Sequence, residues 1–397
     1  MPASKPHEQA ARPGLARPCL KRNPTIVDSG EALEDLVARA GRCDRVAIDT
    51  EFVWERTYYP RLGLIQVGLS LDECYLVDVP AIGELKALGE LLENPTVQLV
   101  LHDAIQDLSI LRRVTGSSPR HVFDTRCAAG FVGLSSTLSL SDLLAELLEV
   151  DLSKAASRTN WLQRPLTAAQ LDYAAGDVRY LIAASERLEQ RARERGLEGW
   201  LSEELRTYDE PSLYEERDER EQFARLKGIH RCQPRELAVL RELAAWREQE
   251  ARRLDRPRAH IVGDATLVHL ARFKPKTVED LNGFHGLSDR KISRFGTELL
   301  AAAVAGLEAK TCPALPPRPR DPRARKRHID ALLAHVRRRG ADVGIDPQLV
   351  TSRAELKDLF SGGEQAVAQR ILGGWRKEFM GDLSEVGGGA ALGLGAV

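Results

Sequence analysis

Residues 45–52 have the sequence Arg-Val-Ala-Ile-Asp-Thr-Glu-Phe, in which apolar and β-branched side chains lead into two carboxylates. This composition predicts a β-strand. Side chains two residues apart on a strand point to the same face, so Asp49 and Glu51 are expected to lie together at the strand end. The strand alone leaves two interpretations open, a pair of solvated surface acids or one half of a metal site.

The pattern on both sides of this strand predicts an α/β fold, a mixed sheet flanked by helices. Further strands are expected at residues 62–69, 74–79, 97–101 and 121–123. The runs 62–69 and 74–79 are separated by a polar turn and should form an antiparallel pair. Helices are expected at residues 31–40, 83–93, 104–114, 125–131, 139–148 and 167–195.

The character of the chain changes near residue 205, after which the apolar spacing is helical. The expected organisation is a disordered leader (1–24), the α/β domain (25–205), a charged linker (206–228), a helical domain (229–311), a Pro-rich linker (312–323), a second helical domain (324–382) and a flexible tail (383–397). All candidate catalytic residues precede residue 180, so the first half is expected to suffice for chemistry.

Composition excludes several classes of protein. The net charge is −1, so any surface for nucleic acid must be local. The sequence contains no run of about 18 apolar residues, so no membrane span is expected. The six cysteines are scattered and form no C-x-x-C pair, which argues against a zinc site and favours the reducing cytoplasm. The phosphate-binding motif of a helicase or ATPase motor is absent.

Two further segments carry acids in a suggestive context. Asp107 lies in the expected helix 104–114 among apolar neighbours, whereas Asp103 at its start suits a simple role as a helix-dipole acid. Tyr173 and Asp177 are four residues apart, so a helix places the phenol and the carboxylate on one face. An ordinary neighbour pair would explain this spacing too, but a buried carboxylate needs a partner.

A cluster of these acids predicts metal binding. Four carboxylates brought together repel one another unless hard cations lie between them, and oxygen ligands suit Mg²⁺ or Mn²⁺. Of two such ions about 3.5–4 Å apart, one can activate the water that attacks a phosphodiester and the other can stabilise the leaving oxygen. Tyr173 would then position the attacking water, because a phenol with an ordinary pKa near 10 is a poor base.

The ordered motifs resemble the DEDDy exonucleases, through Asp49-x-Glu51, Asp107 and Tyr173-x-x-x-Asp177. Residues 58–66 (YYPRLGLIQ) and 157–166 (SRTNWLQRPL) resemble the ribonuclease D family in particular. Residues 240–246 and 281–295 are similar to the HRDC module found also in RecQ-type helicases. The resemblance covers roughly residues 25–380, and one departure is Asn160, where relatives often have Asp.

This resemblance implies an RNase H-like fold and a 3′→5′ exoribonuclease that releases nucleoside 5′-monophosphates, with a role in maturing tRNA and other small RNAs. It implies two divalent metal ions with Asp49, Glu51, Asp107 and Asp177 as ligands and Tyr173 as the water-orienting residue. The expected partner is RNA with a free 3′ end. The alternatives are a 3′→5′ DNA exonuclease and an inactive RNA-binding scaffold, although a scaffold would be expected to lack one of these residues.

Several residues are candidate contacts to RNA. Thr50 and Phe52 belong to the first motif, and Phe52 could stack under a terminal base or be a core residue. His102 could contact a phosphate or be a hydrogen-bonded loop histidine. A basic run at 313–340 is either a solvated face or a phosphate-binding surface, represented by Arg325, Lys326 and Arg327. No obligate protein partner is indicated, and a monomer is expected.

Overall fold

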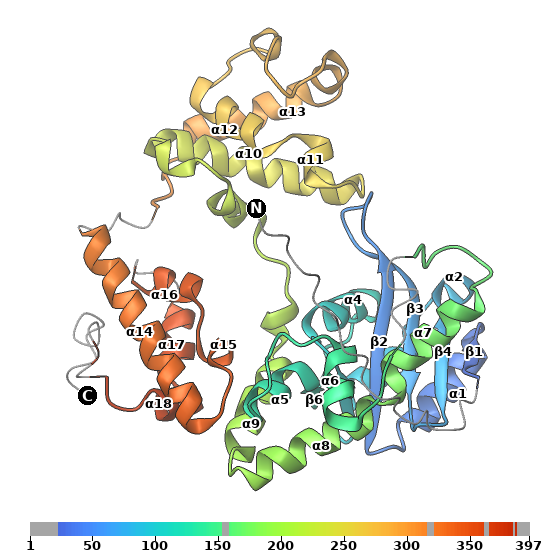
Figure 1. Ribbon diagram of the computed structural model, residues 1–397. Coiled ribbons are helices and arrows are strands. Elements are labelled where there is room, and N and C mark those ends of the chain that lie inside the picture. The colour runs from blue at the N-terminus through green and yellow to red at the C-terminus, as the bar shows by residue number, and fades with distance from the viewer. Residues whose placement is uncertain (1–22, 153–158, 316–320, 361–364, 384–385, 387–397) are drawn as a thin grey trace, which may run out of the picture.

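The chain forms an α/β domain followed by two groups of helices (Figure 1). This computed structural model describes residues 23–152, 159–315, 321–360, 365–383 and 386. Most of the expected leader and tail lies outside the described residues, as do Arg318 and Arg320 of the basic run and the first two residues of the motif at 157–166. No helix in the described ranges has both the length and the apolar character needed to cross a membrane.

Six strands form one mixed sheet in the order β1-β4-β3-β2-β5-β6. The strands are β1 (Thr25–Val27), β2 (Arg45–Val53), β3 (Arg61–Gly68), β4 (Cys74–Asp78), β5 (Gln98–Leu101) and β6 (Val122–Asp124). β3 is antiparallel to both of its neighbours, and the other pairs are parallel. The five expected strands and the antiparallel pair are confirmed. β1 was not expected, because three residues carry too little pattern; its pairing with β4 defines it.

Helices cover the sheet and confirm the expected fold class. They are α1 (Gly30–Ala40), α2 (Val79–Ile82), α3 (Ala87–Glu93), α4 (Ile105–Thr115), α5 (Thr125–Phe131), α6 (Leu140–Leu148), α7 (Ala168–Arg179), α8 (Leu181–Glu194) and α9 (Glu198–Leu205). Two expected helices were wrong in extent. The helix predicted at 83–93 begins at Ala87, because Gly83 with φ of 77° ends α2 first. The helix predicted at 167–195 breaks at Tyr180, since α7 packs on β3 and β4 whereas α8 packs on β5.

The first helical domain is held to the α/β domain by the hairpin between β2 and β3. It contains α10 (Pro234–Arg253), α11 (Arg258–Ile261), α12 (Asp264–Phe273) and α13 (Asp289–Glu308), around a core of their own. Figure 1 shows the hairpin reaching α10 and α11. At its tip the Tyr58 hydroxyl donates to the buried carboxylate of Glu248, and the Tyr58 amide donates to Asp255 at 3.0 Å.

The segment after α9 differs from the charged linker expected at 206–228. It forms the short 3₁₀ helices η1 (Arg206–Asp209), η2 (Pro211–Tyr214) and η3 (Glu219–Arg225). The Tyr208 hydroxyl donates to Asp124 Oδ2 at 3.0 Å, and the side chain of Tyr214 is buried against the α/β domain. The contacts of Tyr208 and Tyr214 fix the first part of this charged segment to the α/β domain.

The second helical group packs directly on the α/β domain. It consists of α14 (Pro322–Val343), α15 (Pro347–Val350), α16 (Arg353–Leu359), α17 (Gln365–Leu372) and α18 (Gly374–Met380). Trp375 lies in the same apolar cluster as Phe131 of α5, with ring centroids 4.9 Å apart. Arg376 forms a two-pronged ion pair with Glu204 of α9. A boundary at residue 205 therefore cuts through a shared core, which argues against the expectation that the first half suffices by itself.

Candidate active site

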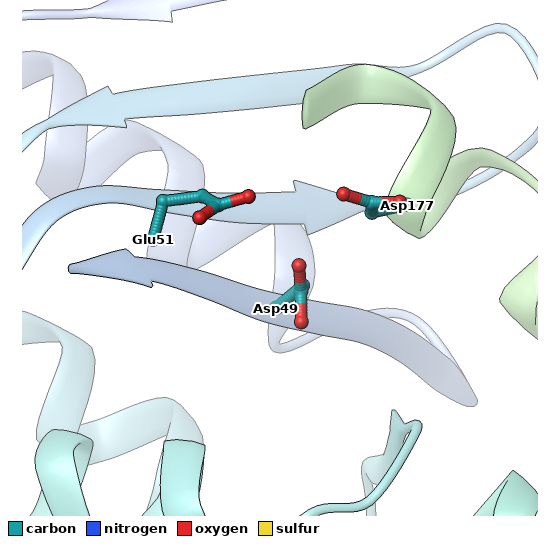
Figure 2. Close-up of side chains that lie close together, drawn as sticks. All are labelled: Asp49, Glu51 and Asp177. Carbon is teal, nitrogen blue, oxygen red and sulfur yellow. The ribbon is translucent and has the colours of Figure 1, made fainter. Parts of the chain in front are cut away.

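Three of the expected carboxylates converge at the sheet. Asp49 and Glu51 project from β2, and Asp177 approaches from α7, which packs across β2 to β4 (Figure 2). One carboxylate oxygen from each residue lies within 4.8 Å of the others. Residues 49 and 51 share a face because they are two apart on one strand, whereas Asp177 joins them only through the packing of α7. This oxygen-only group can hold a hard divalent cation.

Electrostatics at this group favour a bound cation. Burial, with the charges of Asp107, Asp177 and Glu51, raises the pKa of Asp49 well above its usual range. Burial and the charges of Asp177 and Asp107 raise the pKa of Glu51 to about 8. Burial raises the pKa of Asp177 to about 7, against an opposing hydrogen bond from Tyr173. Without a counter-charge these carboxylates hold protons, so a metal ion fits the site chemically.

The fourth expected ligand, Asp107, lies beside the group without being part of it. Its side chain is buried in the first turn of α4 and accepts a hydrogen bond from the Thr50 hydroxyl. Its charge acts on Asp49 and Glu51, and its own burial raises its pKa to about 6. Thr50, expected as an RNA contact, instead has a buried side chain that orients Asp107.

Tyr173 lies one helical turn before Asp177 and is hydrogen-bonded to it. Burial, together with the negative charges of Asp177, Glu51 and Asp49, raises the pKa of the phenol. Tyr173 is therefore a neutral hydrogen-bond donor at physiological pH. The Trp161 ring packs 6.1 Å from the Tyr173 ring and is 2% exposed, so Trp161 has a structural role beside the phenol.

Residues 58–66 and 159–166, from the two segments that resemble ribonuclease D, contact each other behind Tyr173. Gly63 of β3 has no side chain where the Trp161 backbone crosses, and an added Cβ would lie 2.4 Å from the Trp161 carbonyl oxygen. Arg164 donates to the Gly63 carbonyl and to both carboxylate oxygens of Asp78, each at 2.8 Å. This network fixes the loop that supports Tyr173.

Gln66 is a site residue that the sequence analysis missed. It pairs with Asp49 across β2 and β3, and its Nε2 donates to Asp49 Oδ2 at 3.3 Å. The side chain is fully buried, and its Oε1 has no hydrogen-bond partner within the described residues. A glutamine inside the apolar run 62–69 was the available signal, because a buried amide is retained only where it makes a specific contact.

The remaining candidates lie away from the carboxylate group or are engaged within the fold. His102 is hydrogen-bonded through Nδ1 to Thr125 and through Nε2 to the Leu138 carbonyl, which fits the loop-histidine alternative. Phe52 is partly buried and packs against the apolar core, which fits the alternative of a core residue. Asp124, another carboxylate near the sheet, caps α5 by accepting hydrogen bonds from two of its backbone amides.

The basic triplet expected to bind RNA lies in the first turns of α14. Arg325 is half-buried, whereas Lys326 and Arg327 are exposed. These residues lie in the second helical group, whereas the carboxylates lie in the α/β domain. That helical group shares a core with α5 and α9.

Magnesium is expected to stabilise the protein more at high pH than at low pH. The pKa values of Glu51 and Asp177 in the fold, about 8 and about 7, exceed their usual values of 4.5 and 3.8. The folded state therefore binds protons more tightly than the unfolded state, and the metal-free protein loses this stability as pH rises from about 4 through 8. Deprotonation also frees the ligands for Mg²⁺, which at 100 times its Kd adds about 2.7 kcal/mol.

The measurement is the melting temperature with and without Mg²⁺ at pH 5.5 and pH 8.5. The increase should be clearly larger at the higher pH, and an Asp49→Asn variant should show little increase at either. Equal increases for the wild type at both pH values would contradict the assigned role of these carboxylates.

Comparisons with known proteins identify the family of the chain. Residues 24–192 match the family model described as 3′-5′ exonuclease, and residues 236–303 match the HRDC domain. The chain is 39% identical over 368 residues to ribonuclease D of Desulfotalea psychrophila, covering 91% of this chain and 97% of the relative. It is 37% identical to ribonuclease D of Pseudomonas paraeruginosa, covering 85% and 90%.

A solved structure supports the same relationship over most of the chain. The crystal structure of Escherichia coli RNase D, described as an exoribonuclease involved in structured RNA processing, matches with a TM-score of 0.82 and 27% identity, covering 94% of this chain and 98% of that one. The chain therefore belongs to the ribonuclease D family of 3′→5′ exoribonucleases.

Proposed function

We propose that this enzyme removes nucleotides singly from RNA 3′ ends with two divalent ions, Mg²⁺ or Mn²⁺, held by Asp49, Glu51, Asp107 and Asp177. The observation that carries the proposal is the convergence of three carboxylates within 4.8 Å beside the neutral phenol of Tyr173. When bound, the ions supply an activated water and neutralise charge at the leaving oxygen.

The protein's own groups position these reactants. The Tyr173 hydroxyl orients the attacking water by a hydrogen bond, since its raised pKa makes it a poor base. Gln66 holds the Asp49 carboxylate, and Thr50 holds that of Asp107. Attack by the water oxygen on the last phosphodiester breaks the bond to the 3′ oxygen of the preceding nucleotide. The products are a nucleoside 5′-monophosphate and an RNA with a new 3′ hydroxyl.

The substrates we propose are tRNA precursors and other small RNAs with free 3′ ends. The similar Escherichia coli protein acts in structured RNA processing. Exposed Lys326 and Arg327 on α14 suit contacts to phosphates, because each neutralised phosphate releases counterions. The enzyme is proposed to act as a monomer in the cytoplasm, where the free thiols of the five described cysteines would stay reduced.

The direct test is degradation of one RNA labelled at either end, in the presence of Mg²⁺. RNA labelled at the 3′ end should release its label at once as nucleoside 5′-monophosphate, whereas RNA labelled at the 5′ end should shorten progressively. A tRNA precursor with a 3′ extension should be trimmed, and single-stranded DNA of the same sequence should be degraded much more slowly. Equal rates on DNA and RNA would favour the DNA exonuclease alternative.

A further inference from the structure

A cavity of about 690 Å³ lies outside the carboxylate group. One wall is the hairpin that follows β2, another is α4, and a third is the segment around η2. Its lining includes Trp54, Tyr59, Gln106, Arg113 and Tyr214. None of the metal-binding candidates lines it.

The lining suits a flat, uncharged ring. Trp54 is 53% exposed, although its Nε1 donates to the Tyr58 carbonyl at 3.0 Å and so fixes the indole. The guanidinium of Arg113 lies over the Tyr59 ring. Aromatic faces of this kind stack on nucleobases whatever the sequence, with a contribution that alanine substitution can measure.

The charges around the cavity are already paired. Arg113 Nη1 lies 3.2 Å from a carboxylate oxygen of Glu216, and Arg112 Nη2 lies 3.9 Å from one of Glu215. A phosphate would have to displace these acids from the arginines or lie beside them, which like charges oppose. An uncharged base requires neither, so the cavity favours a base over the backbone.

The cavity shares two elements with the active site. Trp54 follows Glu51 by three residues, which is about 10 Å along an extended chain. Gln106 directly precedes Asp107 on α4. An RNA whose last phosphodiester lies at the carboxylates therefore has its nearby nucleotides within reach of the cavity.

We propose that this cavity is a base-stacking subsite in which Trp54 stacks on one nucleobase of the RNA substrate near its 3′ end. The proposal rests on the proposed function and adds a residue to substrate binding that takes no part in the chemistry. Trp54 holds the RNA in place without preference for sequence, because every base presents an aromatic face.

The test is a double-mutant cycle between Trp54 and the RNA. Wild type, Trp54→Ala and Trp54→Phe are assayed on a six-nucleotide RNA and on versions with one abasic nucleotide at each of the first five positions from the 3′ end. Trp54→Ala should raise KM roughly 5- to 100-fold on intact RNA with little change in kcat. Trp54→Phe should recover most of this loss.

The decisive result is coupling at one position. On the RNA that lacks the stacked base, wild type and Trp54→Ala should have nearly equal KM, whereas the other abasic RNAs should keep the difference. Ile26→Ala, an exposed apolar residue on edge strand β1, is the matched control and should leave KM unchanged. If Trp54→Ala raised KM equally on every abasic RNA, or on none of them, the subsite would be overturned.

These outcomes are distinct from failure of the proposed function. A wild-type protein inactive on all these RNAs would overturn the exoribonuclease mechanism itself. If the wild type is active and Trp54→Ala has the same kinetics, the subsite alone would be overturned.

Discussion

Asp49→Asn is expected to lower RNA hydrolysis by at least about 10³-fold while leaving the protein folded, because in the proposed mechanism activation of the water and stabilisation of the leaving group both depend on bound metal. Asp49 is the carboxylate on which the charges of Asp107, Asp177 and Glu51 all act. Asparagine keeps the shape of the side chain and, like the protonated Asp49 of the metal-free fold, carries no charge, so the metal-free fold should be about as stable as the wild type.

Tyr173→Phe separates metal binding from positioning of the water. The phenol is hydrogen-bonded to Asp177 and, with its raised pKa, stays neutral, so it is expected to position the water and not to bind metal. We expect a rate lower by about 10²- to 10⁴-fold, as for other lost positioning or proton-transfer groups. Calorimetry should show nearly unchanged Mg²⁺ affinity for Tyr173→Phe and a large loss for Asp49→Asn.

Asp103→Asn is the matched control for both variants. Its carboxylate is exposed at 63%, pairs with Arg126 and lies outside the carboxylate group. Asparagine also tolerates the φ of 62° at this position. Activity and Mg²⁺ affinity should stay near the wild type. Near-normal turnover of Asp49→Asn at saturating Mg²⁺ would show that this carboxylate is not a required ligand.

Trp375→Ala is expected to destabilise the protein by about 3–5 kcal/mol, the usual cost of removing a buried aromatic side chain. Trp375 is 1% exposed and packs against Phe131 and Trp200, with its Nε1 donating to Glu204 at 2.8 Å. The substitution opens a cavity in the core shared by the second helical group and the α/β domain, and it leaves Glu204 with one partner fewer.

Urea denaturation measures this effect, and Trp54→Ala is the control. Trp54 has the same side chain but is half-exposed, so its loss should change stability by less than about 0.5 kcal/mol. A Trp375→Ala variant as stable as the wild type would mean that the helical group does not share a core with the α/β domain. The nuclease domain could then be isolated at residue 205, as the sequence suggested.

Much of the active site could be predicted because its parts are local. Two residues on one strand, Asp49 and Glu51, share a face through the period of two, and Tyr173 and Asp177 share a face through one helical turn. The α/β class followed from strands that alternate with helices, and the family resemblance ordered these pieces along the chain. Each of these inferences needs only neighbours within a few residues.

The errors and omissions concern the packing of distant segments. The break at Tyr180 was hidden by a continuous helical pattern, because the change of direction depends on which strands α7 and α8 cover. The buried contact of Gln66 with Asp49 depends on the register of β2 against β3. His102 had two plausible roles, and only its neighbours Thr125 and Leu138 distinguish them.

The sequence by itself predicted the class of fold, the acidic residues of the candidate site and the family. Only the tertiary structure decided that Asp177 meets β2, that Asp107 lies beside the other three carboxylates, and that the second helical group completes the core around Phe131. The physical reason is the range of the interactions. Backbone periodicity and capping act over one or two turns of chain, whereas burial of apolar surface and pairing of buried charges join residues that can be more than two hundred positions apart.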